Sequence, residues 1–147
     1  MAGLSRDQFV ALSEARTAVL STVTSAGRPR PVPICFVLDA IDDGRSAIFS
    51  PIDDKPKTAG DPIELARIRD ITANPQVSVL IDRWSEDWNR LGWLRIDGRA
   101  AIVEPSAAVV GALREKYPQY VGHRLESRPM IRIVVERARG WGILAGD

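Results

Sequence analysis

Several residue types that support common catalytic chemistries are scarce in this 147-residue sequence. Cys35 is its only cysteine and His123 its only histidine. An internal disulfide is therefore excluded, and a Cys/His zinc site or a Cys–His catalytic pair is nearly so. The sequence also contains no G-x-S-x-G, Walker or G-x-G-x-x-G motif. No side chain can be named as a catalytic nucleophile, and no metal site is expected.

Long hydrophobic runs and an excess of one charge are missing as well. No apolar stretch approaches the roughly 18 residues of a membrane-spanning helix, and Met1–Asp7 is polar where a signal peptide would be apolar. We therefore expect a cytoplasmic protein without membrane association. Twenty basic and nineteen acidic residues give a formal net charge of +1. Because non-specific nucleic-acid binding needs a basic field, no nucleic-acid partner is expected.

The composition is otherwise that of a globular protein, with 45% apolar and 27% charged residues. The length fits one domain, so residues 1–147 are expected to form a single unit. The basic residues are nearly all arginines, and the only lysines are Lys55, Lys57 and Lys116. The first two share the polar loop Pro51–Gly60.

Short β-branched or alternating segments recur along the chain. They predict strands at residues 17–25, 28–40, 46–50, 77–82, 93–103 and 130–136, with a short last one at 139–143. Alternation within 93–103 directs Leu94, Ile96, Ala100 and Ile102 inward. Helices are too few for a strict strand–helix alternation, which favours a mainly β fold with flanking helices, built as a small antiparallel barrel.

Helix signals occur at three places. Ser5-Arg6-Asp7-Gln8 is typical of a capping box and predicts a helix from Arg6 to about Ala15. Asp61-Pro62-Ile63-Glu64 predicts a second helix start, with Leu65, Ile68 and Ile71 or Thr72 as the buried stripe and Asn74-Pro75 as its end. Pro105–Lys116 predicts a third helix. The second one is expected to cap or flank the barrel.

A first candidate site joins the two loop lysines to Arg67 and Arg69 of the second predicted helix. Together with the helix N-terminus they could hold a phosphate or a polyanionic tail. Equally, the two arginines could be solvated residues on the polar helix face. The composition does not decide between these interpretations.

A second candidate site lies in the proline-rich segment 30–34, beside Phe49-Ser50-Pro51. Prolines leave strand carbonyls unpaired, and such a backbone can face a flat aromatic ring. The alternative is an edge strand that its prolines protect against aggregation.

Trp84, Trp88 and Trp93 form a third group, which could wall a cofactor pocket or a dimer groove, or form a satellite cluster under a long loop. Cys35 is expected to be a small core residue and His123 a surface residue.

Order and spacing over roughly residues 5–140 resemble the flavin-binding split-barrel proteins related to pyridoxamine 5′-phosphate oxidase. Within them, the chain resembles the actinobacterial branch that uses the deazaflavin coenzyme F-420. Three stretches carry the resemblance: the strand–turn–strand segment 18–39, the helix–strand segment 67–82 with its Asn-Pro-Gln-Val-Ser pattern, and 93–100, which ends in Gly-Arg-Ala.

The resemblance implies a homodimer of six-stranded split barrels with two cofactor sites at the subunit interface. It assigns the phosphate contact to Arg67, eight positions before Pro75, where the family usually has lysine. It further assigns cofactor contacts to Lys55 and Lys57, Arg30, Val32 and Pro33, Ser50 and Pro51, and Trp93. The implied activity is hydride transfer between the reduced deazaflavin and an unknown small organic substrate. An FMN-dependent enzyme and a non-catalytic cofactor- or haem-binding protein remain alternatives.

Overall fold

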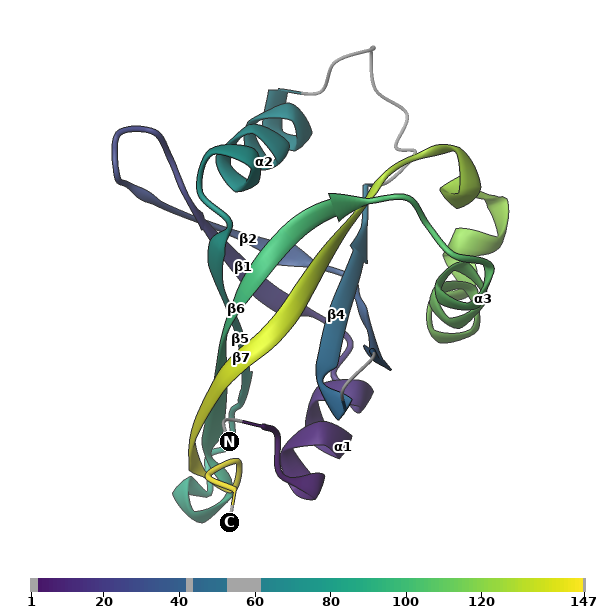
Figure 1. Cartoon of the computed structure of the whole chain (residues 1–147). Coiled ribbons are helices and arrows are strands. Elements are labelled where there is room, and N and C mark those ends of the chain that lie inside the picture. Colours follow the sequence, from purple (N-terminus) through teal and green to yellow (C-terminus); the bar gives the residue numbers. More distant parts are fainter. Residues whose placement is uncertain (1–2, 42–43, 53–61, 147) are drawn as a thin grey trace.

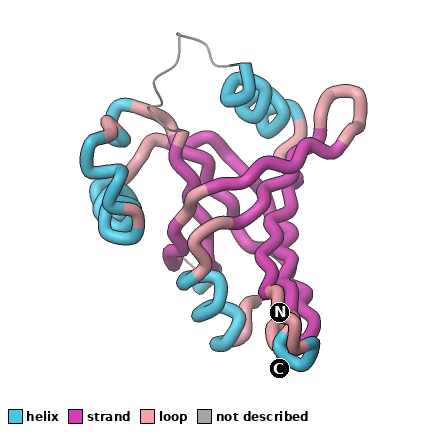
Figure 2. Tube along the Cα trace, turned by 180° about the vertical axis from the view of Figure 1, so that it is seen from behind, coloured by secondary structure: helices cyan, strands magenta, loops and turns pink. Residues whose placement is uncertain are grey.

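The computed structural model describes residues 3–41, 44–52 and 62–146, which form one antiparallel sheet with helices outside it (Figures 1 and 2). In chain order the elements are α1 (Arg6–Glu14), β1 (Ala18–Val23), β2 (Pro29–Ile34), β3 (Val37–Ala40), β4 (Ser46–Pro51), α2 (Pro62–Ala73), β5 (Gln76–Arg83), η2 (Trp88–Arg90), β6 (Gly92–Val103), α3 (Ala107–Lys116), η3 (Pro118–Gly122), η4 (Leu125–Ser127) and β7 (Met130–Gly142).

The strand order is β2-β1-β5-β6-β7-β4-β3. Its two end strands, β2 and β3, are consecutive in the chain and separated only by Cys35 and Phe36. Three Cα–Cα steps reach at most about 11 Å, so the two ends of the sheet must lie close together. The sheet therefore curls into a barrel that stays open along one seam, between β2 and β3.

The sheet has seven strands and not the expected six, and its strands differ from the predicted segments in two places. The segment 28–40 is two strands, because the chain turns inward at Phe36, whose side chain is fully buried. The Phe36 N–H donates to the Tyr117 hydroxyl (3.1 Å) and does not join a strand ladder. The segments 130–136 and 139–143 are in turn one long strand, β7, which bulges at Glu136 opposite Asp97 and Gly98.

The barrel interior follows the predicted alternation. On β5 the buried residues are Val77, Val79 and Ile81, and on β6 Leu94, Ile96 and Ala100 are buried, as expected. They pack with Leu20, Ile48, Ile131 and Ile133 from the other strands and with Leu12 of α1. A second cluster lies under α3, where Val109, Val110 and Leu113 meet Val37, Tyr117 and Met130.

The predicted helices are present. The α1 capping box is confirmed, because the Ser5 hydroxyl accepts from the Gln8 N–H and the Gln8 side chain accepts from the Ser5 N–H. The Gln8 amide also donates to the Leu144 carbonyl (3.0 Å) and ties the end of β7 to this helix. In Figure 1, α2 lies at the end of the barrel reached by the β1–β2 hairpin. Within the described residues, no helix has the length and apolar character that crossing a bilayer requires.

Candidate functional site around helix α2

Helix α2 carries two arginines that the sequence did not distinguish but that differ in their burial. Arg67, Asp70 and Ile71 are buried, with Arg67 9% exposed, whereas Arg69 and Thr72 are exposed. Residues three or four apart share one helix face, so Arg67 belongs to the face turned toward the sheet. The interpretation of both arginines as solvated residues is therefore wrong for Arg67 and holds for Arg69.

Asp70 connects this helix to two strands. Its Oδ2 accepts from the Thr22 hydroxyl of β1 (2.9 Å) and from Arg30 Nε of β2 (2.8 Å). The carboxylate is 6% exposed and the Arg30 side chain 43% exposed. A buried carboxylate needs such donors. The bond from Nε to Asp70 also fixes the position of the Arg30 side chain.

Arg67 has no comparable partner. In the part of the chain that the structure describes, no carboxylate or carbonyl oxygen pairs with its guanidinium. A nearly buried cation is costly to leave without an anion or strong acceptors. A phosphate group satisfies a guanidinium with charge-assisted hydrogen bonds. The chemistry of this position therefore fits the phosphorylated cofactor that the resemblance implies.

The predicted β2 and β4 residues lie on either side of the seam. Val32 is half-buried and Pro33 exposed on the edge strand β2, paired with Leu20 and Val19 of β1. Ser50 and Pro51 are buried at the end of β4, and Pro51 pairs with Met130. The Ser50 hydroxyl donates to the Cys35 carbonyl (2.8 Å), so it braces the β2–β3 connection and keeps only lone pairs for a ligand. Cys35 is half-buried and lies between β2 and β3, so the expectation of a small core residue within a strand is wrong.

Trp93 does not join this group within one chain. It pairs with Asp82 and Trp141, whereas Arg99, six residues further along β6, pairs with Gln76, which closely follows α2. Six strand residues span about 20 Å, so Trp93 lies near the far end of β6. Trp84 and Trp88 are 70% and 73% exposed and form no buried cluster. Lys55 and Lys57 lie outside the described residues.

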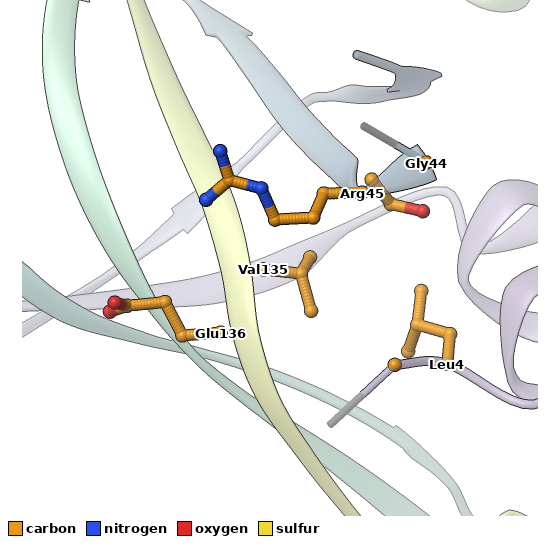
Figure 3. Close-up of a pocket in the computed structure, with 7 residues that line it drawn as sticks. Leu4, Gly44, Arg45, Val135 and Glu136 are labelled. Carbon is orange, nitrogen blue, oxygen red and sulfur yellow. The ribbon is translucent and has the colours of Figure 1, made fainter. Parts of the chain in front are cut away.

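A small hollow of about 90 Å³ lies beside the candidate site, between α2 and the β1–β2 turn. It is lined by Thr24, Ser25, Arg30, Ala66, Arg69, Asp70 and Ala73. A larger one of about 410 Å³ contains none of the predicted residues (Figure 3). There Leu4 and Val135 line the interior while the Glu136 carboxylate points away. Among the described residues, no three His, Cys, Asp or Glu side chains gather into a metal site.

Sequence reasoning missed Asp70 and Thr22. Asp70 stands three positions after Arg67, a spacing that shares a helix face, and this was a usable signal. Nothing local in the sequence marks Thr22, because its role depends on β1 passing under α2. His123 was expected at the surface but is half-buried, with its ring edge-on to Tyr120.

A second titratable cluster lies under α3. Lys116 Nζ donates to the Phe36 carbonyl (3.0 Å) and stands 4.0 Å from the centre of the Phe36 ring. Burial and the neighbouring Arg16 lower the pKa of Lys116 to about 8, against an opposing effect of Cys35. Burial raises the pKa of Tyr117, although its bond to the Phe36 backbone acts the other way. Neither side chain reaches the residues around α2.

Comparison with known proteins decides the family. A family model described as pyridoxamine 5′-phosphate oxidase matches residues 6–142. The chain belongs to this family. No curated protein sequence matches the chain significantly. The matched residues include all three motif stretches.

Solved structures share the pyridoxamine 5′-phosphate oxidase-like fold. A putative pyridoxamine 5′-phosphate oxidase from Listeria innocua is 22% identical with a TM-score of 0.61, covering 92% of this chain and 97% of its own. HutZ, the haem storage protein from Vibrio cholerae, is 19% identical with a TM-score of 0.63, covering 95% and 94%. An FAD-binding protein from Mesorhizobium loti is 21% identical with a TM-score of 0.59, covering 93% and 94%. At identities of 19–22%, the similarity shows only that the folds are alike.

Proposed function

We propose that this chain is a homodimeric oxidoreductase that binds the deazaflavin coenzyme F-420, with Arg67 holding the cofactor phosphate. The observation that carries the proposal is the nearly buried Arg67 on α2, eight positions before Pro75 and without an anionic partner in the described residues. Membership of a family with a flavin-binding structural neighbour supports a flavin-type cofactor.

The surrounding residues support an extended anionic ligand. Arg30, oriented by Asp70, and the exposed Arg69 line the hollow next to α2. Lys55 and Lys57 precede the same helix in the chain. A series of cations beyond the phosphate contact suits the polyglutamate tail of the deazaflavin, which FMN lacks. We assign the tail to this series and the phosphate to Arg67.

The remaining assigned residues would hold the ring system. Val32 and Pro33 lie on β2, which borders the open seam, and Ser50 and Pro51 lie at the end of β4, where the Ser50 hydroxyl donates to the Cys35 carbonyl of the β2–β3 connection. Trp93 is too far from Arg67 to act in the same chain, so its contribution requires a second copy. When bound and reduced, the deazaflavin supplies a hydride for a small electron-poor organic substrate. The chain's own residues bind, orient and exclude water.

The test compares two arginines of one helix. Purified apo-protein is titrated with F-420, FMN and haemin, following fluorescence and absorbance, for the wild type, Arg67→Ala and Arg69→Ala. We expect selective binding of F-420. Arg67→Ala should weaken it by about 1–3 kcal/mol, which corresponds to roughly five- to 150-fold, because a charge-assisted bond is lost. Arg69→Ala removes only a solvent-screened contact to the tail, because its side chain is exposed, and should have a much smaller effect.

Each other outcome changes the proposal in a defined way. Preference for FMN would keep the phosphate assignment and replace the deazaflavin. Binding of haemin alone would favour a haem-binding protein without hydride transfer. Unchanged affinity in a folded Arg67→Ala variant would overturn the phosphate assignment. If none of the three ligands bound, the proposal of an oxidoreductase would be refuted.

A further inference from the structure

The end of the sheet away from α2 carries an exposed aromatic surface. β5 leaves α2 and ends at Arg83, and the loop that follows holds Trp84 and Trp88, which are 70% and 73% exposed. The end of β7 adds Trp141 and Ile143, which are 52% and 45% exposed. Figure 1 shows this end beside the chain termini, opposite α2. Several large apolar side chains exposed together mark an interaction site more often than single ones do.

Within this surface lies an open hollow of about 330 Å³ lined by Arg83, Trp84, Ser85, Arg90 and Ile143. Its frame is fixed by backbone contacts. The Ile143 N–H donates to the Leu91 carbonyl (3.0 Å), and the Arg90 N–H donates to the Asp87 carbonyl (2.9 Å). At Gly142, which has a φ of +65°, a Cβ would stand 2.1 Å from the Leu91 carbonyl oxygen. The two crossing segments are thus packed backbone to backbone.

The hollow is positively charged. In the described part of the chain, neither the Arg83 nor the Arg90 guanidinium has an ion-pair or hydrogen-bond partner, and no carboxylate is among the lining residues. The nearby Asp87 uses one carboxylate oxygen, Oδ1, to accept from the Asn89 N–H (3.1 Å) and the Asn89 amide (3.3 Å). The lining therefore combines two arginines with one tryptophan and one isoleucine.

We infer that this hollow binds a small anion with a flat aromatic part, such as an aryl phosphate, sulfonate or carboxylate. Paired guanidiniums match the oxygens of such groups, and an indole face stacks on an aromatic ring. A volume near 330 Å³ lies at the lower end of the range of small-molecule sites. The hollow lies at the end of β5 away from α2, beside the Trp93 that the proposed function assigns to the contact with a second copy.

The test follows the indole N–H signals of the tryptophans by NMR in the full-length protein. The probes are phenyl phosphate, cyclohexyl phosphate, inorganic phosphate and benzyl alcohol. Phenyl phosphate should shift the Trp84 signal in a saturable way. The three other probes each lack the ring, the hydrocarbon part or the charge, and should bind at least about tenfold more weakly. Equal binding of phenyl and inorganic phosphate would overturn the aromatic part of the inference.

Matched variants locate the site. The double variant Arg83→Gln/Arg90→Gln should weaken phenyl phosphate binding by about tenfold or more, whereas Arg99→Gln, an exposed arginine toward the other end of β6, should not. Trp84→Phe should lower the affinity, whereas Trp88→Phe, equally exposed but outside the hollow, should leave it unchanged. No saturable shift of the Trp84 signal, or equal effects of both members of each pair, would refute the site.

Discussion

Lys116 is a cation placed where its charge is poorly solvated. Its ammonium stands over the Phe36 ring and donates to the Phe36 carbonyl, two contacts that favour the charged form. Burial and the Arg16 guanidinium, 4.8 Å from the centre of the Tyr117 ring, act against it. The lowering of the pKa to about 8 shows that burial and like charge prevail.

This pKa predicts a pH dependence of stability. The ordinary lysine pKa is 10.5, so above pH 8 the unfolded chain holds a proton on Lys116 that the folded chain releases. The free energy of unfolding should therefore rise as the pH increases above 8. The raised pKa of Tyr117 acts in the opposite direction above pH 10.0, which limits the rise to the window between pH 8 and pH 10.

Urea unfolding at several pH values in this window measures the slope. Lys116→Met keeps an unbranched side chain against Phe36 and removes the charge, so its slope should be smaller than that of the wild type. Arg16→Gln, which removes one cause of the shift, should reduce the slope in part. The same slope in wild type and Lys116→Met would contradict the assignment.

At the residue scale, the sequence left the environments of the candidate residues open. The resemblance assigns the phosphate contact to Arg67, eight positions before Pro75, but the residues alone gave Arg67 and Arg69 the same two interpretations. Only the packing of α2 on the sheet distinguishes them, since Arg67 shares the buried face with Asp70 and Ile71. Likewise the role of Asp70 depends on Thr22 and Arg30, which lie 48 and 40 positions away in the chain.

At the scale of elements, β2 is an edge strand of unusual chemistry. Pro29, Pro31 and Pro33 pair with alternate residues of β1, while Arg30 and Val32 lie between them. Because proline has no N–H, it is tolerated only where that group would point out of the sheet. The outer edge of β2 therefore offers carbonyl acceptors and no donors over this stretch. This supports the protected-edge interpretation of the segment and leaves those carbonyls accessible.

Restoring one donor should change the behaviour of the edge. Pro31→Val supplies an outward N–H on an apolar strand and should promote self-association beyond the native state, because an edge with donors and acceptors can pair with another chain. Pro31→Lys supplies the same N–H with a charge that opposes pairing. Light scattering over time should separate the two variants. Identical scattering by both would show that the missing donors do not control association.

The elements that sequence reasoning placed well are those with local signals. The α1 capping box and the alternation of β5 and β6 depend on residues within one element. The break between β2 and β3 was missed because it depends on Tyr117, whose hydroxyl contacts the Phe36 N–H and carbonyl and the Arg16 carbonyl from α3's end. No pattern within 28–40 reveals that contact.

At the scale of the whole molecule, the proposed cofactor site is incomplete in one chain. Arg67 and Trp93 lie toward opposite ends of the sheet, so a site that contains both needs two copies. We expect light scattering to give a mass near twice 16.2 kDa. A cofactor held by both copies should also stabilise the dimer, by about 2.7 kcal/mol at a hundredfold excess over its Kd. A monomeric mass would contradict the assignment of Trp93.

The closure of the sheet through Cys35 and Phe36 also bears on how the chain folds. The inner strands pair residues far apart in sequence, such as Val19 with Leu80 and Ala47 with Val134, while the neighbours β2 and β3 never pair. Folds rich in distant pairings gain little from early local contacts and form slowly, in roughly milliseconds to seconds. The gap between β2 and β3 can reach its final width only after β1 has paired with β5 and β4 has paired with β7. A ligand at the seam would then bind a part of the molecule that is completed last.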